Sequence, residues 1–380
     1  MNFLLVGTNP ENTGAATHFV ALAQALVEAG HQVHVVAAAG GLIEQELVDA
    51  DVHMYRATFR NALDLRGYLK VLSVAKLARP DWLVGNFGKE YWPLIVIGRL
   101  LRIPVALFRH RVPPMKRLSG YLLPRLADRF FAVSNHARQA YLDRGVPPQR
   151  VQVLYNPVNM ALCQRSPVQR SAILRSLGIL GDPIVLGYCG RMHQGKGIFT
   201  LFEAATAAMA QEPRLHCLWL GTGPDAQALR DLAVADGLGN RHHFPGWVNN
   251  IHPYYSAMSM LAFPSIAPET FGRASVEAQA AGIPVLASNV GGVPETLDPG
   301  VTGVLLPPGN VAAWRTAILE MCDSTRRLPM GAAAQEFVRG HFGTSVIAAE
   351  FVKQLTTAIV PNPSGTDINH HPHGARRSPG

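Results

Sequence analysis

The chain has 380 residues, of which 48% are hydrophobic and 16% charged, and its formal net charge is +8. This composition excludes a disordered or fibrous chain and predicts large buried cores, and the length suits two domains of roughly 150–200 residues. The cysteines form no CxxC pair, and no histidine cluster has metal-ligand spacing, which argues for a reducing compartment and against a zinc or iron–sulfur site. The four cysteines are Cys163, Cys189, Cys217 and Cys322.

Neither a signal peptide nor a membrane-spanning segment is expected. The N-terminus MNFLLVG lacks a basic region and a cleavage site, and the most apolar window, 92–108, is interrupted by Arg99 and Arg102. Positive charge is concentrated in residues 99–150, which hold eleven lysines and arginines against two acidic residues. We therefore expect a soluble or peripheral protein whose basic half meets nucleic acid, anionic lipid or a phosphorylated substrate.

In chain order, the first half alternates apolar runs with helical patterns. An apolar run at 2–6 is followed by a polar loop, a helix that ends at Gly30, and a strand at 32–38. Further strands are expected at 81–86, 104–108 and 129–134. This alternation is typical of a parallel sheet covered by helices on both faces.

A second cycle begins at 183. The expected strands are 183–190, 215–221, 241–244, 260–265 and 284–288, and the helices are 197–209, 225–236, 250–258 and 272–281. We therefore predict an α/β protein of two doubly wound, Rossmann-like domains that face a central cleft, with ligands at the carboxyl ends of the strands.

The domain boundaries follow from this pattern. We expect an N-terminal, acceptor-binding domain over 1–160, a linker over 161–182 and a C-terminal, nucleotide-sugar-binding domain over 183–345. A helix over 346–360 is expected to cross back to the first domain, and the tail 361–380 lacks apolar periodicity and is expected to be disordered.

The segment PETFGRASVEAQAAGIPV (268–285) places two carboxylates in a small, apolar stretch. Glu269 precedes the expected helix and Glu277 lies in its second turn, and neither has an obvious basic partner. Free amides at the helix start, around Gly272, predict a phosphate site, and a carboxylate beside it suits sugar or ribose hydroxyls. The alternative is a surface glutamate and a first-turn carboxylate with no ligand.

The segment CGRMHQGKG (189–197) follows the first strand of the second half. Arg191 and Lys196 are placed to neutralise a diphosphate without a metal ion. A solvated basic turn is the alternative.

Taken together, GR-x4-KG, PETFG-x4-EA-x3-G-x-PV and GGVPE (291–295) resemble the family 4 retaining glycosyltransferases of the GT-B fold, also called glycosyl transferases group 1. The segment 13–31 resembles the first loop and helix of that family, and the resemblance covers almost all of residues 1–355. It implies that Arg191 and Lys196 hold the diphosphate of a nucleotide sugar, and that Glu277 holds its ribose. It further implies that the transferred sugar and the nearer phosphate are held by Glu269, Thr270, Phe271 and Gly272.

In the first domain, the resemblance implies that Gly14 lines the diphosphate pocket, and Thr13 stands where the family has a glycine. His110, after the strand 104–108, resembles the family residue beside the reacting sugar, where an imidazole can bind hydroxyls and assist proton movement near neutral pH. A plain loop histidine is the alternative. The implied catalytic set is His110, Arg191, Lys196 and Glu269. The acidic pair at 49–51 is expected to be an exposed turn, so neither a metal nor another cofactor is expected.

The sequence thus predicts a metal-independent, retaining glycosyltransferase that moves a sugar from a nucleotide-diphosphate donor to a hydroxyl of an envelope glycolipid, lipopolysaccharide or polysaccharide. Basic amphipathic stretches at 55–80 and 115–129 suggest a cytoplasmic protein that binds peripherally to the inner face of the membrane. The alternative is that these stretches are ordinary surface helices with a solvated basic face. The alternatives are a catalytically degenerate nucleotide-sugar-binding protein, an epimerase, and a basic nucleic-acid-binding protein. Nucleic acid is not the expected partner, because no RNA-binding motif or recognition helix is present.

Overall fold

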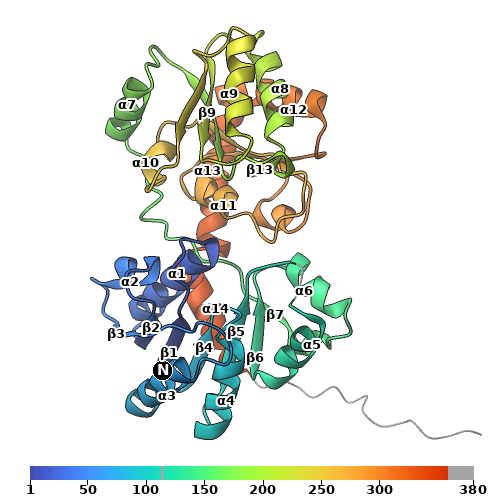
Figure 1. Ribbon diagram of the computed structural model, residues 1–380. Helices are drawn as coiled ribbons and strands as arrows, with labels where there is room; N and C mark the ends of the chain where they lie inside the picture. The colour runs from blue at the N-terminus through green and yellow to red at the C-terminus, as the bar shows by residue number, and fades with distance from the viewer. Residues whose placement is uncertain (113–114, 358–380) are drawn as a thin grey trace, which may run out of the picture.

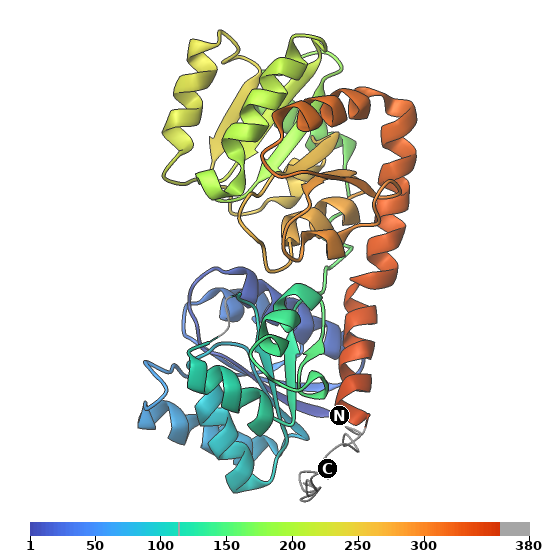
Figure 2. The ribbon, with the colours of Figure 1, turned by 90° about the vertical axis from the view of Figure 1, so that its right-hand side faces the viewer.

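A computed structural model describes residues 1–112 and 115–357. Its two lobes are stacked, and the long C-terminal helices run along one side from the upper lobe to the lower (Figures 1 and 2). The predicted disordered tail, 361–380, lies outside the described residues.

The lower lobe is built on a seven-stranded parallel sheet in the order β3-β2-β1-β4-β5-β6-β7. Its strands are β1 (Asn2–Gly7), β2 (Gln32–Ala37), β3 (His53–Arg56), β4 (Trp82–Gly85), β5 (Val105–Arg109), β6 (Arg129–Ala132) and β7 (Gln152–Val153). Its helices are α1 (Gly14–Glu28), α2 (Leu42–Leu47), α3 (Leu65–Ala78), α4 (Tyr91–Leu101), α5 (Arg117–Leu126), α6 (Asn135–Leu142) and the short η1 (Pro148–Arg150).

The upper lobe is built on a six-stranded parallel sheet in the order β10-β9-β8-β11-β12-β13. Its strands are β8 (Ile184–Cys189), β9 (Leu215–Leu220), β10 (His242–Gly246), β11 (Met260–Phe263), β12 (Val285–Ser288) and β13 (Gly303–Leu306). Its helices are α7 (Pro167–Ser176), η2 (Gln194–Lys196), α8 (Ile198–Met209), α9 (Ala226–Ala235), α10 (His252–Tyr255), α11 (Arg273–Ala280), η3 (Val293–Thr296), α12 (Val311–Cys322) and α13 (Ser324–His341).

Both sheets are doubly wound, as predicted. The strand order reverses beside β1 in one sheet and beside β8 in the other, and these central strands are almost entirely buried. Crevices form at such reversal points because the loops after neighbouring strands leave in opposite directions. The loops after β1 and β8 carry Thr13–Gly14 and Gly190–Lys196, so the topology brings these two segments to the same space between the lobes.

The predicted linker 161–182 is wrong in part, because it contains a helix. Helix α7 begins at Pro167 with the Ser166 side chain as its cap, packs beside α10, and contributes Leu174 to the core of the upper lobe. Serine and proline at a helix start are strong signals, and here they mark a helix of the second domain rather than a connection.

Helix α14 (Thr344–Thr356) crosses back to the lower lobe, in agreement with the predicted 346–360 helix over its described part (Figure 2). Its residues Ile347 and Phe351 are buried in the core of the first domain beside Phe108 and Phe131. The guanidinium of Arg129 donates to carbonyl oxygens at the end of this helix, including that of Gln354 at 2.7 Å. The chain therefore passes between the two lobes twice, once at 154–166 and once where α13 leads into α14.

Candidate active site between the two domains

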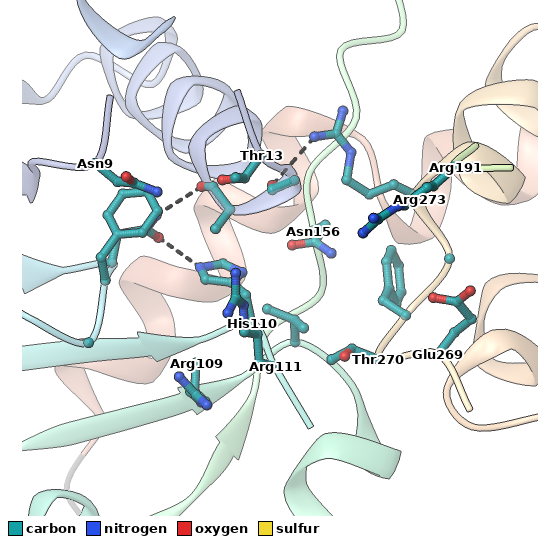
Figure 3. A pocket seen from close by; sticks show the side chains of 18 of the residues that line it. Asn9, Thr13, Arg109, His110, Arg111, Asn156, Arg191, Glu269, Thr270 and Arg273 are labelled. Carbon is teal, nitrogen blue, oxygen red and sulfur yellow. Dashed lines mark hydrogen bonds between the residues drawn. The ribbon is translucent and has the colours of Figure 1, made fainter. Parts of the chain in front are cut away.

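Two adjoining cavities, of about 1110 Å³ and about 880 Å³, open between the lobes. Loops after the central strands of both sheets line them, and Figure 3 shows the larger one. The residues common to both cavities are Thr13, Gly14, Gly190, Arg191 and Arg273. Of the sequence-predicted set, His110, Lys196, Glu269, Thr270, Phe271 and Gly272 line the larger cavity and Glu277 the smaller. The structure therefore brings every predicted residue together around one connected space.

Glu269 is held by two side chains at the edge of the larger cavity. Its Oε1 accepts a 2.6 Å hydrogen bond from the Ser265 hydroxyl and forms an ion pair with the ammonium of Lys196. The loop that carries Lys196 packs closely against the end of β11: Gly197 has a positive φ of 68°, and a Cβ there would lie only 1.8 Å from the carbonyl oxygen of Pro264. The ion pair thus joins the segment 189–197 to the segment 268–285.

Glu277 is buried and also has a basic partner. Its carboxylate pairs with the guanidinium of Arg273 and accepts a 3.0 Å hydrogen bond from the Tyr255 hydroxyl. Burial raises the pKa of this carboxyl, but the charge and hydrogen bonds of Arg273, together with His252 and the Tyr255 hydrogen bond, lower it by more, so the pKa lies below its ordinary value. The expectation that neither glutamate has an obvious partner is wrong, because Lys196 serves one and Arg273 the other.

Helix α11 begins at Arg273, directly behind the larger cavity. The residue before it, Gly272, has a φ of 121° and carries no side chain to cap the helix. The Ser275 amide donates to the Gly272 carbonyl oxygen at 3.1 Å, so the helix start offers the amides of Arg273 and Ala274 to a ligand. Arg273 also spans the cleft, because its Nη1 donates to the Gly14 carbonyl oxygen at 3.4 Å. Thr13 caps helix α1 by accepting from the Ala16 amide at 3.3 Å. The side chain that replaces the family glycine therefore has a structural role of its own.

Arg191 is exposed and borders both cavities. Its carbonyl oxygen accepts from the Tyr188 hydroxyl at 2.9 Å, and the next amide, that of Met192, donates to the Thr222 carbonyl oxygen at 2.9 Å. The backbone of this loop is thereby fixed while the guanidinium stays open to the cavities (Figure 3).

His110 forms the opposite wall, in the first domain (Figure 3). Its Nε2 lies 2.8 Å from Oδ1 of Asn86, whose Nδ2 donates to the Ala15 carbonyl oxygen at 2.8 Å. Since the amide nitrogen of Asn86 is committed to Ala15, its oxygen must accept, and Nε2 of His110 carries the proton. Sequence reasoning missed Asn86, although it ends an expected strand.

The imidazole of His110 is neutral at pH 7. Burial lowers its pKa well below the ordinary value, and the nearby His18, Arg109 and Arg273 lower it further. His18 is itself buried, with its ring 4.7 Å from that of His110. A neutral imidazole can bind hydroxyls through its ring nitrogens, and the expected help of His110 in proton movement stays a prediction.

The buried carboxylate of Glu90, which sequence reasoning also missed, holds the loop that carries Asn86. Glu90 accepts hydrogen bonds from the amide and hydroxyl of Thr8 and from the amides of Asn86 and Phe87. Burial raises its pKa to about 7. Glu90 thus ties the loop after β1 to the loop that presents Asn86.

The acidic pair Asp49 and Asp51 lies in an exposed turn after α2, as predicted, and neither residue lines the two cavities. Within the two described ranges, no group of three or more histidine, cysteine, aspartate or glutamate residues could hold a metal ion. No helix among the same residues has the length and apolar content needed to cross a membrane.

Comparison with known proteins gives two family matches that together cover about three quarters of the chain. Residues 12–162 match the model of Glycosyltransferase Family 4, and residues 183–324 match that of Glycosyl transferases group 1. This chain belongs to the family 4 glycosyltransferases. The two matches lie on the two sheets and include both walls of the cleft.

Several curated relatives of this glycosyltransferase are D-inositol 3-phosphate glycosyltransferases. That of Thermobispora bispora is 28% identical over 322 residues, which are 78% of this chain and 74% of the relative. That of Geodermatophilus obscurus is 30% identical over 272 residues, which are 66% of this chain and 60% of the relative. The second match thus spans less than two thirds of the relative's length.

Solved structures show the fold. The glycosyltransferase of Rickettsia africae superposes with a TM-score of 0.81 at 19% identity, over 93% of this chain and 97% of that one. The HepE protein of Anabaena in complex with UDP superposes with a TM-score of 0.80 at 23% identity, over 94% of this chain and 100% of that one. The two doubly wound domains therefore form a GT-B fold, as predicted.

Proposed function

We propose that this glycosyltransferase moves a sugar from a UDP-sugar to an acceptor hydroxyl, without a metal ion and with retention of configuration at the sugar. The observation that carries the proposal is that both motif glutamates pair with cations on the upper-lobe side of two adjoining cavities, Glu269 on the larger and Glu277 on the smaller, while His110 lines the lower-lobe side of the larger cavity. Sugar, ribose and diphosphate need such a mixture of fixed charges and hydrogen-bonding groups.

The smaller cavity suits the nucleoside. Glu277 lies on it as an ionised carboxylate that can accept from ribose hydroxyls, and Trp247 lies on its rim with 63% of its surface exposed. An exposed indole beside a cavity offers a flat face for a base. The choice of uracil is supported by the HepE structures, which hold UDP and UDP-glucose.

The departing diphosphate is stabilised by positive charge from the chain itself. Arg191 borders both cavities, Lys196 lies at the larger one, and the uncapped start of α11 contributes its amides. Fixed charges and dipoles in a preorganised site can stabilise a leaving group as a metal ion does. The ammonium of Lys196 would then contact both Glu269 and the phosphate, so donor binding is expected to lengthen or break the ion pair.

The acceptor enters from the first domain, where its hydroxyl attacks the sugar carbon on the face from which the diphosphate departs. Retention of configuration rests on the family resemblance. Neutral His110, oriented by Asn86, is placed to bind a hydroxyl of the sugar or the acceptor. The hydroxyl proton passes to the leaving diphosphate oxygen, so no protein base is needed at this step.

A phosphorylated acceptor fits the charge of this wall. Lys89 and Arg111 line the larger cavity on the first-domain side, and the curated relatives act on D-inositol 3-phosphate. An envelope glycolipid with a phosphate-bearing head group offers the same chemistry. Transfer assays with inositol 3-phosphate, unphosphorylated inositol and a phosphoglycolipid separate these acceptors.

We further propose that the protein associates with the cytoplasmic face of a membrane. Helices α3, α4 and α5 pack side by side on the lower lobe (Figure 1). They expose apolar side chains, among them Leu65, Leu69, Leu100, Leu118 and Tyr121. Basic side chains accompany them: Arg66, Lys70 and Lys76 on α3, Arg99 on α4, and Arg117 and Arg125 on α5. We expect sedimentation with vesicles that contain anionic phospholipid and none with neutral vesicles.

A thermal-shift screen tests the donor first. UDP, GDP, ADP and their sugars are compared with and without EDTA, followed by turnover assays. Stabilisation by UDP that survives EDTA supports the metal-free donor site. Binding without turnover toward any acceptor would favour a degenerate nucleotide-sugar-binding protein, and an absence of binding by all three nucleotides would overturn the proposal.

A further inference from the structure

A single carboxylate of the upper lobe is bound by several donors of the lower lobe. Glu295, on η3, accepts at Oε2 from the backbone amide of Asn135 at 2.7 Å, from its side-chain amide at 3.0 Å and from the Tyr155 hydroxyl at 3.1 Å. Its Oε1 accepts from the His136 amide at 2.8 Å. Both oxygens of Glu295 are therefore used across the domain boundary.

The receiving surface is the start of helix α6. Two of the donors are first-turn amides, which carry the positive end of the helix dipole and favour an anion. The cap residue Ser134 has a double role, since its hydroxyl oxygen accepts from the Ala137 amide at 3.0 Å while its proton goes to the Thr270 carbonyl oxygen. The same helix start thus binds both Glu295 and the loop that carries Glu269 and Thr270.

Within the upper lobe, Glu295 and that loop form one unit. The Gly292 amide donates to the Glu269 carbonyl oxygen at 2.8 Å. A Cβ on Gly291 would lie 2.3 Å from the Glu269 carbonyl oxygen, and one on Gly292 would lie 2.3 Å from that of Thr270. Because no space separates the two segments, a shift of Glu295 moves Glu269 and Thr270 with it.

Tyr155 adds an aromatic contact at the same boundary. It lies on the chain that leaves the lower lobe, and its ring stacks on Phe271 at 5.7 Å and meets Phe342 edge-on at 5.3 Å. Burial and the nearby Glu295 charge raise the pKa of Tyr155 to about 12, so its hydroxyl remains a donor to the carboxylate. The aromatic contact and the hydrogen bond both hold the lobes in this arrangement.

We propose that Glu295 is a positioning residue: an interdomain clasp that holds the Glu269–Thr270 loop against the start of α6 and thereby fixes the transferred sugar opposite His110. The inference rests on the proposed function for its effect on turnover. Its structural part, that Glu295 sets the relative position of the two domains, stands independently of any substrate.

The test compares Glu295→Ala and Glu295→Gln with Glu203→Ala, a control on the exposed face of α8. Small-angle X-ray scattering measures the radius of gyration with and without UDP, calorimetry measures UDP affinity, and steady-state assays separate kcat from KM. For Glu295→Ala we expect a larger radius of gyration, UDP affinity within roughly twofold of wild type, and a kcat lowered about ten- to a hundredfold, as for loss of hydrogen bonds to a charged group. Glu295→Gln keeps one acceptor oxygen and is expected to be intermediate.

A wild-type radius of gyration together with a wild-type kcat in Glu295→Ala would overturn the clasp. If that variant does not fold by circular dichroism, Tyr155→Phe and Asn135→Ala each remove only one side-chain donor, and both are expected to lower kcat severalfold without weakening UDP binding. Wild-type kcat in both would also overturn it. If the wild-type enzyme itself binds no nucleotide, the proposed function fails, while the scattering of the nucleotide-free variants still decides the clasp.

Discussion

Replacement of Glu277 by glutamine tests the nucleoside half of the site. The side chain keeps its size and one acceptor oxygen but loses its charge. Hydrogen bonds to a charged group are worth about 1 kcal/mol more than neutral ones. Because a ribose supplies two hydroxyls, the variant is expected to lose about 2 kcal/mol of UDP binding free energy. This corresponds to a roughly thirtyfold increase in Kd.

Calorimetry with UDP and 2′-deoxy-UDP measures the effect. Wild-type enzyme is expected to prefer UDP, and the preference should shrink in Glu277→Gln because the charged partner of the 2′-hydroxyl is gone. Tyr255→Phe is the matched control: it removes a neighbour of the carboxylate and leaves the charge, so its Kd should change less than about threefold.

The thermal midpoint of each variant shows whether it is folded, since Arg273 loses its ion-pair partner in the first variant. A folded Glu277→Gln variant with the wild-type Kd for UDP would refute the ribose assignment. So would an undiminished preference for UDP over the deoxynucleotide.

Further predictions concern the diphosphate, the histidine wall and the buried carboxylate. Arg191→Ala is expected to lower kcat by roughly two to three orders of magnitude, as for loss of a transition-state charge partner, and near-normal rates in a steady-state assay would contradict that role. Asn86→Ala frees the His110 ring and should lower kcat about tenfold at unchanged UDP affinity; equal kcat would show that the ring needs no orientation. The pKa of Glu90 is raised from 4.5 to about 7, so folding favours its protonated form and its contribution to stability falls as the pH rises through this interval. Relative to wild type, Glu90→Gln should therefore gain on the order of 3 kcal/mol in the free energy of unfolding between pH 4.5 and pH 7, measured by urea unfolding, and parallel pH profiles would contradict the shift.

The parts of the site that the sequence predicts are those with local signals. Gly190 to Gly197 and Pro268 to Gly272 each follow an apolar strand, and glycines mark the positions where the backbone turns or closely approaches a neighbour. The sequence also predicts the two-domain fold, because strands buried in a parallel sheet are continuous apolar runs.

The partners of these residues could not be read from the sequence. Lys196 and Glu269 are 73 residues apart and meet because β8 and β11, the strands before them, are neighbours in the upper sheet. Glu295 lies 160 residues from Asn135 and meets it only because the two lobes pack against each other. Neither β13 nor α13 has a clear periodic signal in the sequence. The edge strand β13 is short and only half-buried, and α13 contains Pro329 and lacks a distinct apolar face. Glu90 looked like an ordinary polar residue, because its burial depends on the loop after β1.

The return of α14 to the first domain has a consequence for biosynthesis. The apolar core around Phe108 and Phe131 is complete only when Phe351 and its neighbours on α14 are in place. Domains usually fold in order as the chain leaves the ribosome, at about 5–20 residues per second. Here the first domain must wait for almost the whole of the second to be translated, and until then it presents an open apolar groove that a chaperone can occupy. Although the N-terminal domain is made first, it is the last to be finished.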